Sequence, residues 1–328
     1  MPLDVDDASP DRTTFEDRDS CDPGGDDPAA ALPPTERRNP ASLELDRLDT
    51  AAVLRLINDQ DATVPGAVRA ALPQLAELVE AGLRTLRAGG RVHYYGAGTG
   101  GRIALGDAVE LGPTYGVGEE AFVAHLAGGP PSAAVAREGA EDEPPEPAER
   151  DAPVAGDLVI GVTASGGTPY VLGALRAARA AGATTALLSG HPQAPAAAFA
   201  DLHVLLETGP EVVTGSTRMK AGTAQKLALN AFSTALMVRS GRTWSNLMVS
   251  ASARNAKLRE RAVRTLVAAC RVTGEQAGAA LDACGQETVT ALVVLVGGCS
   301  PERARAALAA NHGHPWAAVR GLRPGAER

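Results

Sequence analysis

Two glycine-rich segments carry small hydroxyl side chains where a strand is expected to give way to a helix. They read GAGTGGR over 96–102 and TASGGTP over 163–169. Backbone N–H groups at the start of a helix, together with the helix dipole, form a seat for an anion. Hydroxyl donors are available from Thr99, Ser165 and Thr168. A second interpretation stays open, in which the glycines only allow each strand and helix to pack tightly.

A third segment, TGSTRMKAGT over 214–223, places cations at the start of an expected helix. Cations in a first helical turn oppose the helix dipole, so their presence favours a negatively charged ligand or partner. In the alternative interpretation, Ser216 or Thr217 caps the helix and the cations are solvated.

Two glutamates are candidates for acid/base chemistry. Glu110 lies in DAVELGPTYG and Glu141 lies in EGAEDE. Chemistry next to a carbonyl can use two carboxylates, one to take a carbon-bound proton and one to protonate a leaving oxygen. The alternative is that both are solvated surface acids, which the acidic neighbours of Glu141 favour. The histidines are scattered, and we expect His93 to be packed within a strand.

The segments that position these residues alternate between strand and helix patterns. Apolar strand-like runs precede both glycine-rich turns, and ATTALLSG and DLHVLLE are two further short strands. This alternation predicts an α/β fold with a doubly wound parallel sheet, in which ligands bind at the carboxyl ends of the strands. Residues 42–87 are expected to be helical, and the chain from about 256 is helical and rich in alanine.

The acidity of the chain is concentrated at its start. Residues 1–34 hold ten acidic and two basic residues, which accounts for the whole net charge of −8. With little to bury, this segment is predicted to be a disordered tail without the features of a signal peptide. We therefore divide the chain into a tail (1–34), an α/β domain with N-terminal helices (35–255) and a small helical, UBA-like domain (256–328).

Composition excludes several classes of function. No apolar run is long enough to span a bilayer, and no basic patch with interleaved aromatic residues indicates nucleic-acid binding. The four cysteines lack the spacing of metal ligands. These features indicate a reduced, cytoplasmic protein that uses no metal.

From Thr35 onward the sequence resembles the N-acetylmuramic acid 6-phosphate etherase family, whose members contain a sugar isomerase (SIS) domain. The matching pieces include TERRNPASLELDRL, GAGTGGR, the DA-x-E-x-x-PTYG run, EGAED, ASGGTPYV and EVVTGSTRMKAGTAQKLALN. The last piece carries the most specific signal, because it is long, unusual in composition and nearly continuous.

The resemblance implies an SIS fold, a homodimer, no cofactor, and hydrolysis of the lactyl ether of N-acetylmuramic acid 6-phosphate. It implies that Glu110 and Glu141 are the catalytic pair, and leaves open which of them takes the C2 proton. The residues expected to bind the phosphosugar are Thr99, Gly100, Ser165, Gly166, Thr168, Ser216 and Lys220.

Two departures from the family pattern affect the expected phosphate site. Gly100 stands where the family usually has a serine, and Gly167 stands where it usually has an arginine. Loss of a hydroxyl–phosphate bond costs about 1.5–3 kcal/mol unless another donor replaces it. A rival interpretation is therefore a regulatory protein that binds a phosphosugar without chemistry, similar to the glucokinase regulator.

Overall fold

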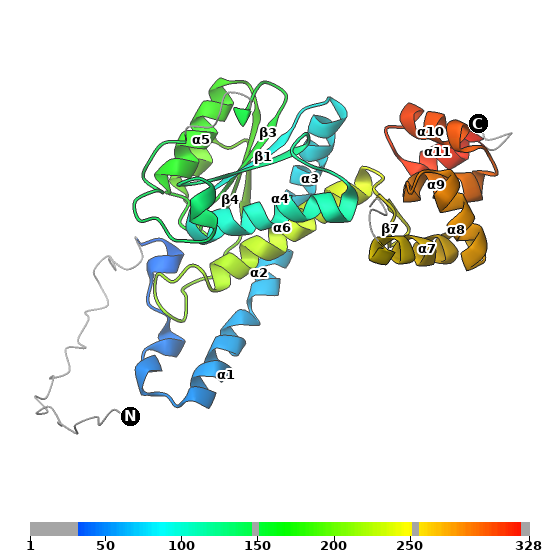
Figure 1. Ribbon diagram of the computed structural model, residues 1–328. Coiled ribbons are helices and arrows are strands. Elements are labelled where there is room, and N and C mark those ends of the chain that lie inside the picture. The colour runs from blue at the N-terminus through cyan, green and yellow to red at the C-terminus, as the bar shows by residue number, and fades with distance from the viewer. Residues whose placement is uncertain (1–31, 146–150, 251–255, 323–328) are drawn as a thin grey trace, which may run out of the picture.

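The computed structural model describes residues 32–145, 151–250 and 256–322, which form an α/β domain followed by a helical domain (Figure 1). All but the last three residues of the expected acidic tail lie outside these ranges. The N-terminal elements are η1 (Pro34–Glu36), η2 (Pro40–Ser42), η3 (Leu45–Arg47), α1 (Thr50–Asp61), α2 (Val64–Ala70) and α3 (Leu72–Arg87). The α/β elements that follow are β1 (Val92–Gly96), α4 (Gly98–Tyr115), β2 (Phe122–Leu126), η4 (Pro130–Ala133), β3 (Leu158–Val162), α5 (Pro169–Ala180), β4 (Thr184–Ser189), η6 (Pro195–Phe199), β5 (Leu202–Leu205) and α6 (Lys220–Arg239).

Five parallel strands form the central sheet in the order β2-β1-β3-β4-β5. Every residue of β1 and β3 is buried, as expected for strands covered on both faces. The chain moves from β1 outward to β2 and then crosses to β3, so the winding direction reverses between β1 and β3. Open α/β sheets bind ligands outside the carboxyl ends of such strands. The topology confirms the parallel α/β fold expected from the sequence.

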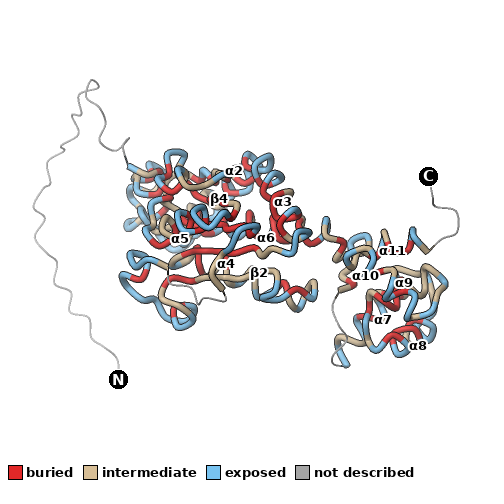
Figure 2. Tube along the Cα trace, turned by 90° about the horizontal axis from the view of Figure 1, so that it is seen from above, coloured by how far each residue is buried: buried red, intermediate tan, exposed pale blue. Residues whose placement is uncertain are grey.

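Alternate side chains of β1 enter two separate cores. Tyr94 packs edge-on against Phe122 and Phe232, on the face covered by α3, α4 and α6. Tyr95 lies on the opposite face, which α5 covers, and its ring is 6.0 Å from that of Tyr170. Figure 2 shows the buried residues gathered where the sheet meets these helices. Several of the chain's few aromatic residues thus pack around β1 at the centre of the sheet.

The N-terminal region is less continuous than its helical pattern predicts. Residues 42–47 form 3-10 turns, and the helices that follow are interrupted at Ala62–Thr63 and at Ala71. Helix α1 buries none of its residues, and it projects from the body of the domain (Figure 1). Leu54 on this helix is 62% exposed. Exposed apolar groups on a projecting element are typical of an interaction surface.

The helical domain has its own core. It contains β6 (Thr243–Trp244), β7 (Leu247–Met248), α7 (Ala256–Cys270), α8 (Gly274–Ala283), α9 (Thr288–Gly297), α10 (Pro301–Ala310) and α11 (Pro315–Leu322). Trp244 stacks on Trp316 with ring centroids 4.7 Å apart, and Val249 is fully buried in the same core. This core therefore includes residues that precede position 256. Within the described ranges, no helix has both the length and the apolar character needed to cross a bilayer.

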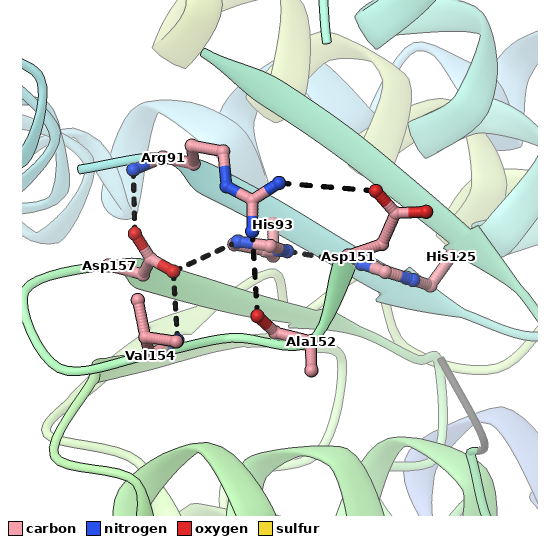
Figure 3. Close-up of polar contacts among 7 residues, drawn as sticks. All are labelled: Arg91, His93, His125, Asp151, Ala152, Val154 and Asp157. Carbon is pink, nitrogen blue, oxygen red and sulfur yellow. Dashed lines mark hydrogen bonds and ion pairs between the residues drawn. The ribbon is translucent and has the colours of Figure 1, made fainter. Parts of the chain in front are cut away.

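Two histidines form a hydrogen-bonded chain between β1 and β2 (Figure 3). His93 Nε2 lies 3.2 Å from Asp157 Oδ2, and His93 Nδ1 lies 3.1 Å from His125 Nε2. Asp157 accepts backbone N–H bonds from Arg91 and Val154, so it accepts from His93 as well. A neutral His93 that donates from Nε2 then accepts at Nδ1 from His125. His93 is fully buried and belongs to the packing of the sheet.

The lowered pKa values of His93 and His125 predict that acid destabilises the fold. Burial lowers the pKa of His93, and burial together with His93 lowers the pKa of His125 to about 4. Below about pH 6.5 the unfolded chain therefore binds more protons than the folded chain. The contribution of the two histidines to the free energy of unfolding is fully present above that pH and is lost as the pH falls. Among the groups facing the pair, Arg91 lowers both pKa values while Asp151 raises them.

Between pH 7 and pH 5, His125 alone is expected to remove about 2 kcal/mol of unfolding free energy. Chemical denaturation at the two pH values measures this difference. Glutamine at position 125 should reduce the difference, whereas glutamine at the exposed His312 should leave it as in the wild type. An equal loss in the wild type and the His125→Gln variant would contradict the assignment.

Candidate active site

The amino-terminal ends of α4 and α5 open onto one cavity of about 250 Å³ at the carboxyl ends of β1 and β3. Neither helix has a side-chain cap at this end, and the first N–H groups of α4 remain available to a ligand. Helix α5 differs, because its first residue, Pro169, has no N–H and the N–H of Tyr170 donates to the carbonyl of Glu141. The residues lining the cavity are Glu36, Ala97, Gly98, Thr99, Gly100, Glu141, Thr163, Ala164, Ser165, Thr168, Gly215, Thr217 and Gln225. The uncapped end of α4 and the hydroxyl-rich turn before α5 thus face one space, an arrangement that suits an anion.

The first glycine-rich turn brings α4 directly onto the end of β1. A Cβ on Gly101 would lie 2.4 Å from the carbonyl oxygen of Gly96, so only glycine allows this approach. Gly98 has φ +52°, in the region that favours glycine. Both interpretations of the turn therefore hold together: its glycines pack the helix tightly, and the same packing exposes the N–H groups of residues 98–100 to the cavity.

Hydroxyl groups organise the second turn, between β3 and α5. The hydroxyls of Thr163 and Thr168 lie 2.7 Å apart, and the Thr163 oxygen also accepts from the backbone N–H of Gly166. The Ser165 hydroxyl accepts from the N–H of Gly167 at 3.2 Å, which leaves the hydroxyl hydrogen free to donate. Gly166 has φ +73° and supports the turn without lining the cavity.

Glu141 provides a carboxylate to this cavity. Its backbone carbonyl accepts from the N–H of Tyr170 at 2.9 Å, which ties the segment to the first turn of α5. The preceding residue, Ala140, is 3% exposed and anchors the segment in the core under α5. The side chain of Glu141 is exposed and lines the cavity opposite the α4 turn. A carboxylate is thus held in the cavity that the two glycine-rich turns line.

The third segment, TGSTRMKAGT, does not offer the first N–H groups of α6 to a ligand, contrary to what the sequence suggests. The carboxylate of Glu211, a fully buried residue, accepts from the N–H groups of Lys220 and Ala221 at 2.9 Å each. The anion at the start of α6 is therefore a side chain of the protein itself. Lys220 points away from the cavity, because its Nζ donates to Gln60 at 3.1 Å. Burial is the main cause of the lowered pKa of Lys220.

Neither Ser216 nor either basic residue of the loop lines the cavity, although Gly215 and Thr217 do. Gly215 has φ +78°, and a Cβ there would lie 3.2 Å from the Glu36 carboxylate. The backbone N–H of Gly215 donates to the carbonyl of Thr35 at 3.0 Å. The loop is thus packed against the start of the described chain and closes one side of the cavity.

Glu110 does not line this cavity. It is on α4, twelve residues after Gly98, which corresponds to about 18 Å along the helix. Its exposed side chain lines a separate, open hollow of about 610 Å³, together with Asp107, Lys226 and Asn230. One copy of the chain therefore does not bring the two glutamates into the same cavity.

Sequence reasoning did not single out Glu36 and Gln225 as site residues, although both line the cavity. Each lies in a segment that matches the family pattern. Glu36 lies in TERRNP, far from the strand ends in the sequence, and Gln225 lies in KAGTAQKLALN. Gln225 is a polar side chain in an alanine- and leucine-rich helical run, and that contrast is the signal that could have found it. In the described part of the chain, no group of three or more histidine, cysteine or acidic side chains is placed to hold a metal ion.

Two family models match the α/β domain. The glucokinase regulatory protein N-terminal SIS domain matches residues 74–179, and the SIS domain matches residues 152–235. These ranges include the sheet and both uncapped helix ends.

Three relatives carry the same name. The N-acetylmuramic acid 6-phosphate etherase of Thermobifida fusca is 53% identical over 264 residues, which are 80% of this chain and 87% of that protein. That of Rubrobacter xylanophilus is 48% identical, covering 84% of this chain and 93% of that protein. The N-acetylmuramic acid 6-phosphate etherase of Yersinia pestis is 46% identical, over 87% of this chain and 98% of that protein. Identity of this level over most of each protein leads to one conclusion: the chain belongs to the N-acetylmuramic acid 6-phosphate etherase family.

Proposed function

We propose that this protein cleaves the D-lactyl ether of N-acetylmuramic acid 6-phosphate, giving N-acetylglucosamine 6-phosphate and D-lactate, in the recycling of cell-wall amino sugars. The observation that carries the proposal is the joint opening of α4 and α5, both uncapped, onto a cavity that also holds Glu141. The relatives that share most of this chain are named for the same activity.

The phosphate is expected at the two helix ends. Backbone N–H groups at Thr99 and Gly100 donate from the α4 turn, and the hydroxyls of Thr99, Ser165 and Thr168 add further donors. Gly166 acts by shaping the turn: its φ of +73° favours glycine, and the lack of a Cβ permits the close approach of Ala194. Ser216 neighbours two cavity residues and remains a proposed ligand, whereas the place of Lys220 beside Gln60 gives it a supporting role.

The reaction needs an acid and a base beside the sugar. In the ring-opened sugar, the C1 aldehyde acidifies the C2 proton; a carboxylate removes it, the C2–C3 double bond forms and the C3–O bond breaks. The departing lactate oxygen takes a proton from the second group, and water then adds its hydroxyl at C3 and a proton at C2. We assign these transfers to Glu141 and Glu110 as a pair, without dividing the two roles between them.

This assignment requires a second copy of the chain. Glu110 and its neighbour Val109, which is 61% exposed, lie on an open face of α4 away from the cavity of their own chain. A homodimer is the simplest assembly that brings Glu110 of the partner subunit to a cavity holding Glu141. The exposed apolar side chain of Leu54 on α1 offers a further contact for the same partner. A cytoplasmic location remains a prediction from the sequence.

The direct test is to incubate the purified protein with N-acetylmuramic acid 6-phosphate and to assay D-lactate, with the Glu141→Gln variant as its control. The wild type should release lactate, and the variant should be slower by about 10²–10⁴-fold, the usual contribution of a general acid or base. Because Glu141 is exposed, its variant should keep the thermal stability of the wild type. Equal lactate release by the two proteins would remove Glu141 from the mechanism.

A second candidate function is regulatory phosphosugar binding, because the model of the glucokinase regulatory protein N-terminal SIS domain matches residues 74–179. A regulatory protein would bind the phosphosugar in the same cavity and release no product. Calorimetric binding of N-acetylglucosamine 6-phosphate, without lactate release from the muramic acid substrate, would favour this function over the etherase.

A further inference from the structure

We propose that the side-chain amide of Gln225 binds the phosphate of the phosphosugar and replaces the hydroxyl that Gly100 lacks. This inference rests on the proposed phosphosugar cavity and adds a specificity-determining residue to it. Gln225 lies on α6 and lines the cavity beside the α4 turn, next to Gly100.

The burial of Gln225 indicates a ligand. The residue is 3% exposed, and its carboxamide has no hydrogen bond to any other residue among those the structure describes. Thr185 and Ser233, two other buried polar side chains of this domain, each donate to a carboxylate: Thr185 to Asp201 at 3.0 Å, and Ser233 to Asp107 at 2.9 Å. The buried hydroxyls of Thr35, Ser132 and Thr208 have no partner among the described residues, but none of them lines the cavity. Since burying an unpaired amide is unfavourable, a carboxamide left facing a polar cavity is best explained by a partner that arrives there.

The position of the amide relative to Gly100 identifies that partner. A Cβ built on Gly100 would lie 3.2 Å from Gln225 Oε1, and 3.2 Å from the carbonyl oxygen of Val162. Both distances are tighter than ordinary contacts, so a side chain at position 100 and the present place of the amide compete for the same space. The amide therefore lies beside the N–H groups of the α4 turn, where the phosphate is expected.

The chemistry of a carboxamide fits this role. Its NH₂ group has two hydrogens to donate, and phosphate oxygens are strong acceptors. The amide oxygen is the atom beside Gly100, so the NH₂ group of the same amide would donate from next to the position where the family usually has a serine hydroxyl. A neutral amide also adds no charge beside Glu36 and Glu141. The amide thus offers a donor at a site where Gly100 lacks the hydroxyl that is usual in the family.

The test compares Gln225→Met, which keeps the side-chain volume and removes the donors, with Gln225→Glu, which adds a negative charge. In the methionine variant, KM for N-acetylmuramic acid 6-phosphate and the calorimetric Kd for N-acetylglucosamine 6-phosphate should each rise about 10-fold or more, equivalent to the loss of one hydrogen bond to a charged group. The glutamate variant should bind more weakly still. The melting temperature of Gln225→Met should equal or exceed that of the wild type, because no internal hydrogen bond is lost.

The matched control is Thr185→Val, another exchange of a buried polar side chain for an apolar one of similar shape. Thr185 has an internal partner, so this variant should melt at a lower temperature and keep the wild-type KM and Kd. N-acetylglucosamine without phosphate is the second control: its weak binding should be the same in the wild type and in Gln225→Met. A difference there would show that the amide contacts the sugar and would overturn the phosphate assignment.

The outcomes separate this inference from the proposed activity. Lactate release with unchanged KM and Kd in Gln225→Met overturns the inference alone. Phosphosugar binding by the wild type that is weakened in the variant, without lactate release by either protein, supports the inference and overturns the etherase. Absence of phosphosugar binding by the folded wild type overturns both.

Discussion

Replacement of Glu110 by alanine is expected to reduce D-lactate release by about 10²–10⁴-fold while leaving the fold intact. The side chain is exposed, and no ion pair or hydrogen bond to it occurs among the described residues, so the folded chain loses little with it. Steady-state kinetics and thermal melting measure the two effects. Glu207→Ala, which removes an exposed acid that lines neither the cavity nor the hollow beside Glu110, serves as the control and should keep most of the activity. Wild-type rates in Glu110→Ala would exclude the residue from the chemistry.

Mixing the Glu110→Ala variant with a Glu141→Ala variant tests whether the two glutamates come from different chains. If each active site takes one glutamate from each subunit, a hybrid dimer has one site with both variants and one site with neither. Random exchange of subunits should then restore about a quarter of the wild-type rate from two inactive proteins. Continued inactivity after exchange, with mixed dimers verified by mass spectrometry, would mean that both glutamates act within one chain.

Replacement of Glu211 by alanine is expected to lower the free energy of unfolding by about 3 kcal/mol, since two buried N–H donors at the start of α6 lose their acceptor. The fully buried carboxylate accepts from Lys220 and Ala221, and it also lies at the positive end of a twenty-residue helix. Chemical denaturation measures the loss. The 214–219 loop, which leads into that helix, should loosen with it, so KM should rise in the same variant.

Glu207→Ala is the control for Glu211, because it removes an exposed acid four residues earlier in the same connection. Its unfolding free energy should stay within about 0.5 kcal/mol of the wild type. Equal stability of the Glu211 variant and this control would show that solvent satisfies the helix end, contrary to the buried geometry.

Local chemistry made the two glycine-rich turns predictable from the sequence. A strand that ends in glycines and small hydroxyl residues before a helical run specifies both the turn and the exposed N–H groups, because φ preference and helix ends depend on neighbouring residues. The parallel sheet followed from the alternation of such units. Thr99, Ser165 and Thr168 were therefore correctly placed near one another, since parallel strands put their carboxyl ends at one edge.

The sequence by itself determined the fold class, the family and the two glycine-rich turns that line the cavity, all of which depend on short-range pattern. Tertiary structure alone decided which residues complete the site. Packing of α6 against α4 turns Gln225 into the cavity and Lys220 toward Gln60, and buries Glu211 as the helix cap. It also separates Glu110 from Glu141. These placements depend on which helix faces meet across the sheet, and contacts between residues far apart in the chain leave no periodic signal in either segment.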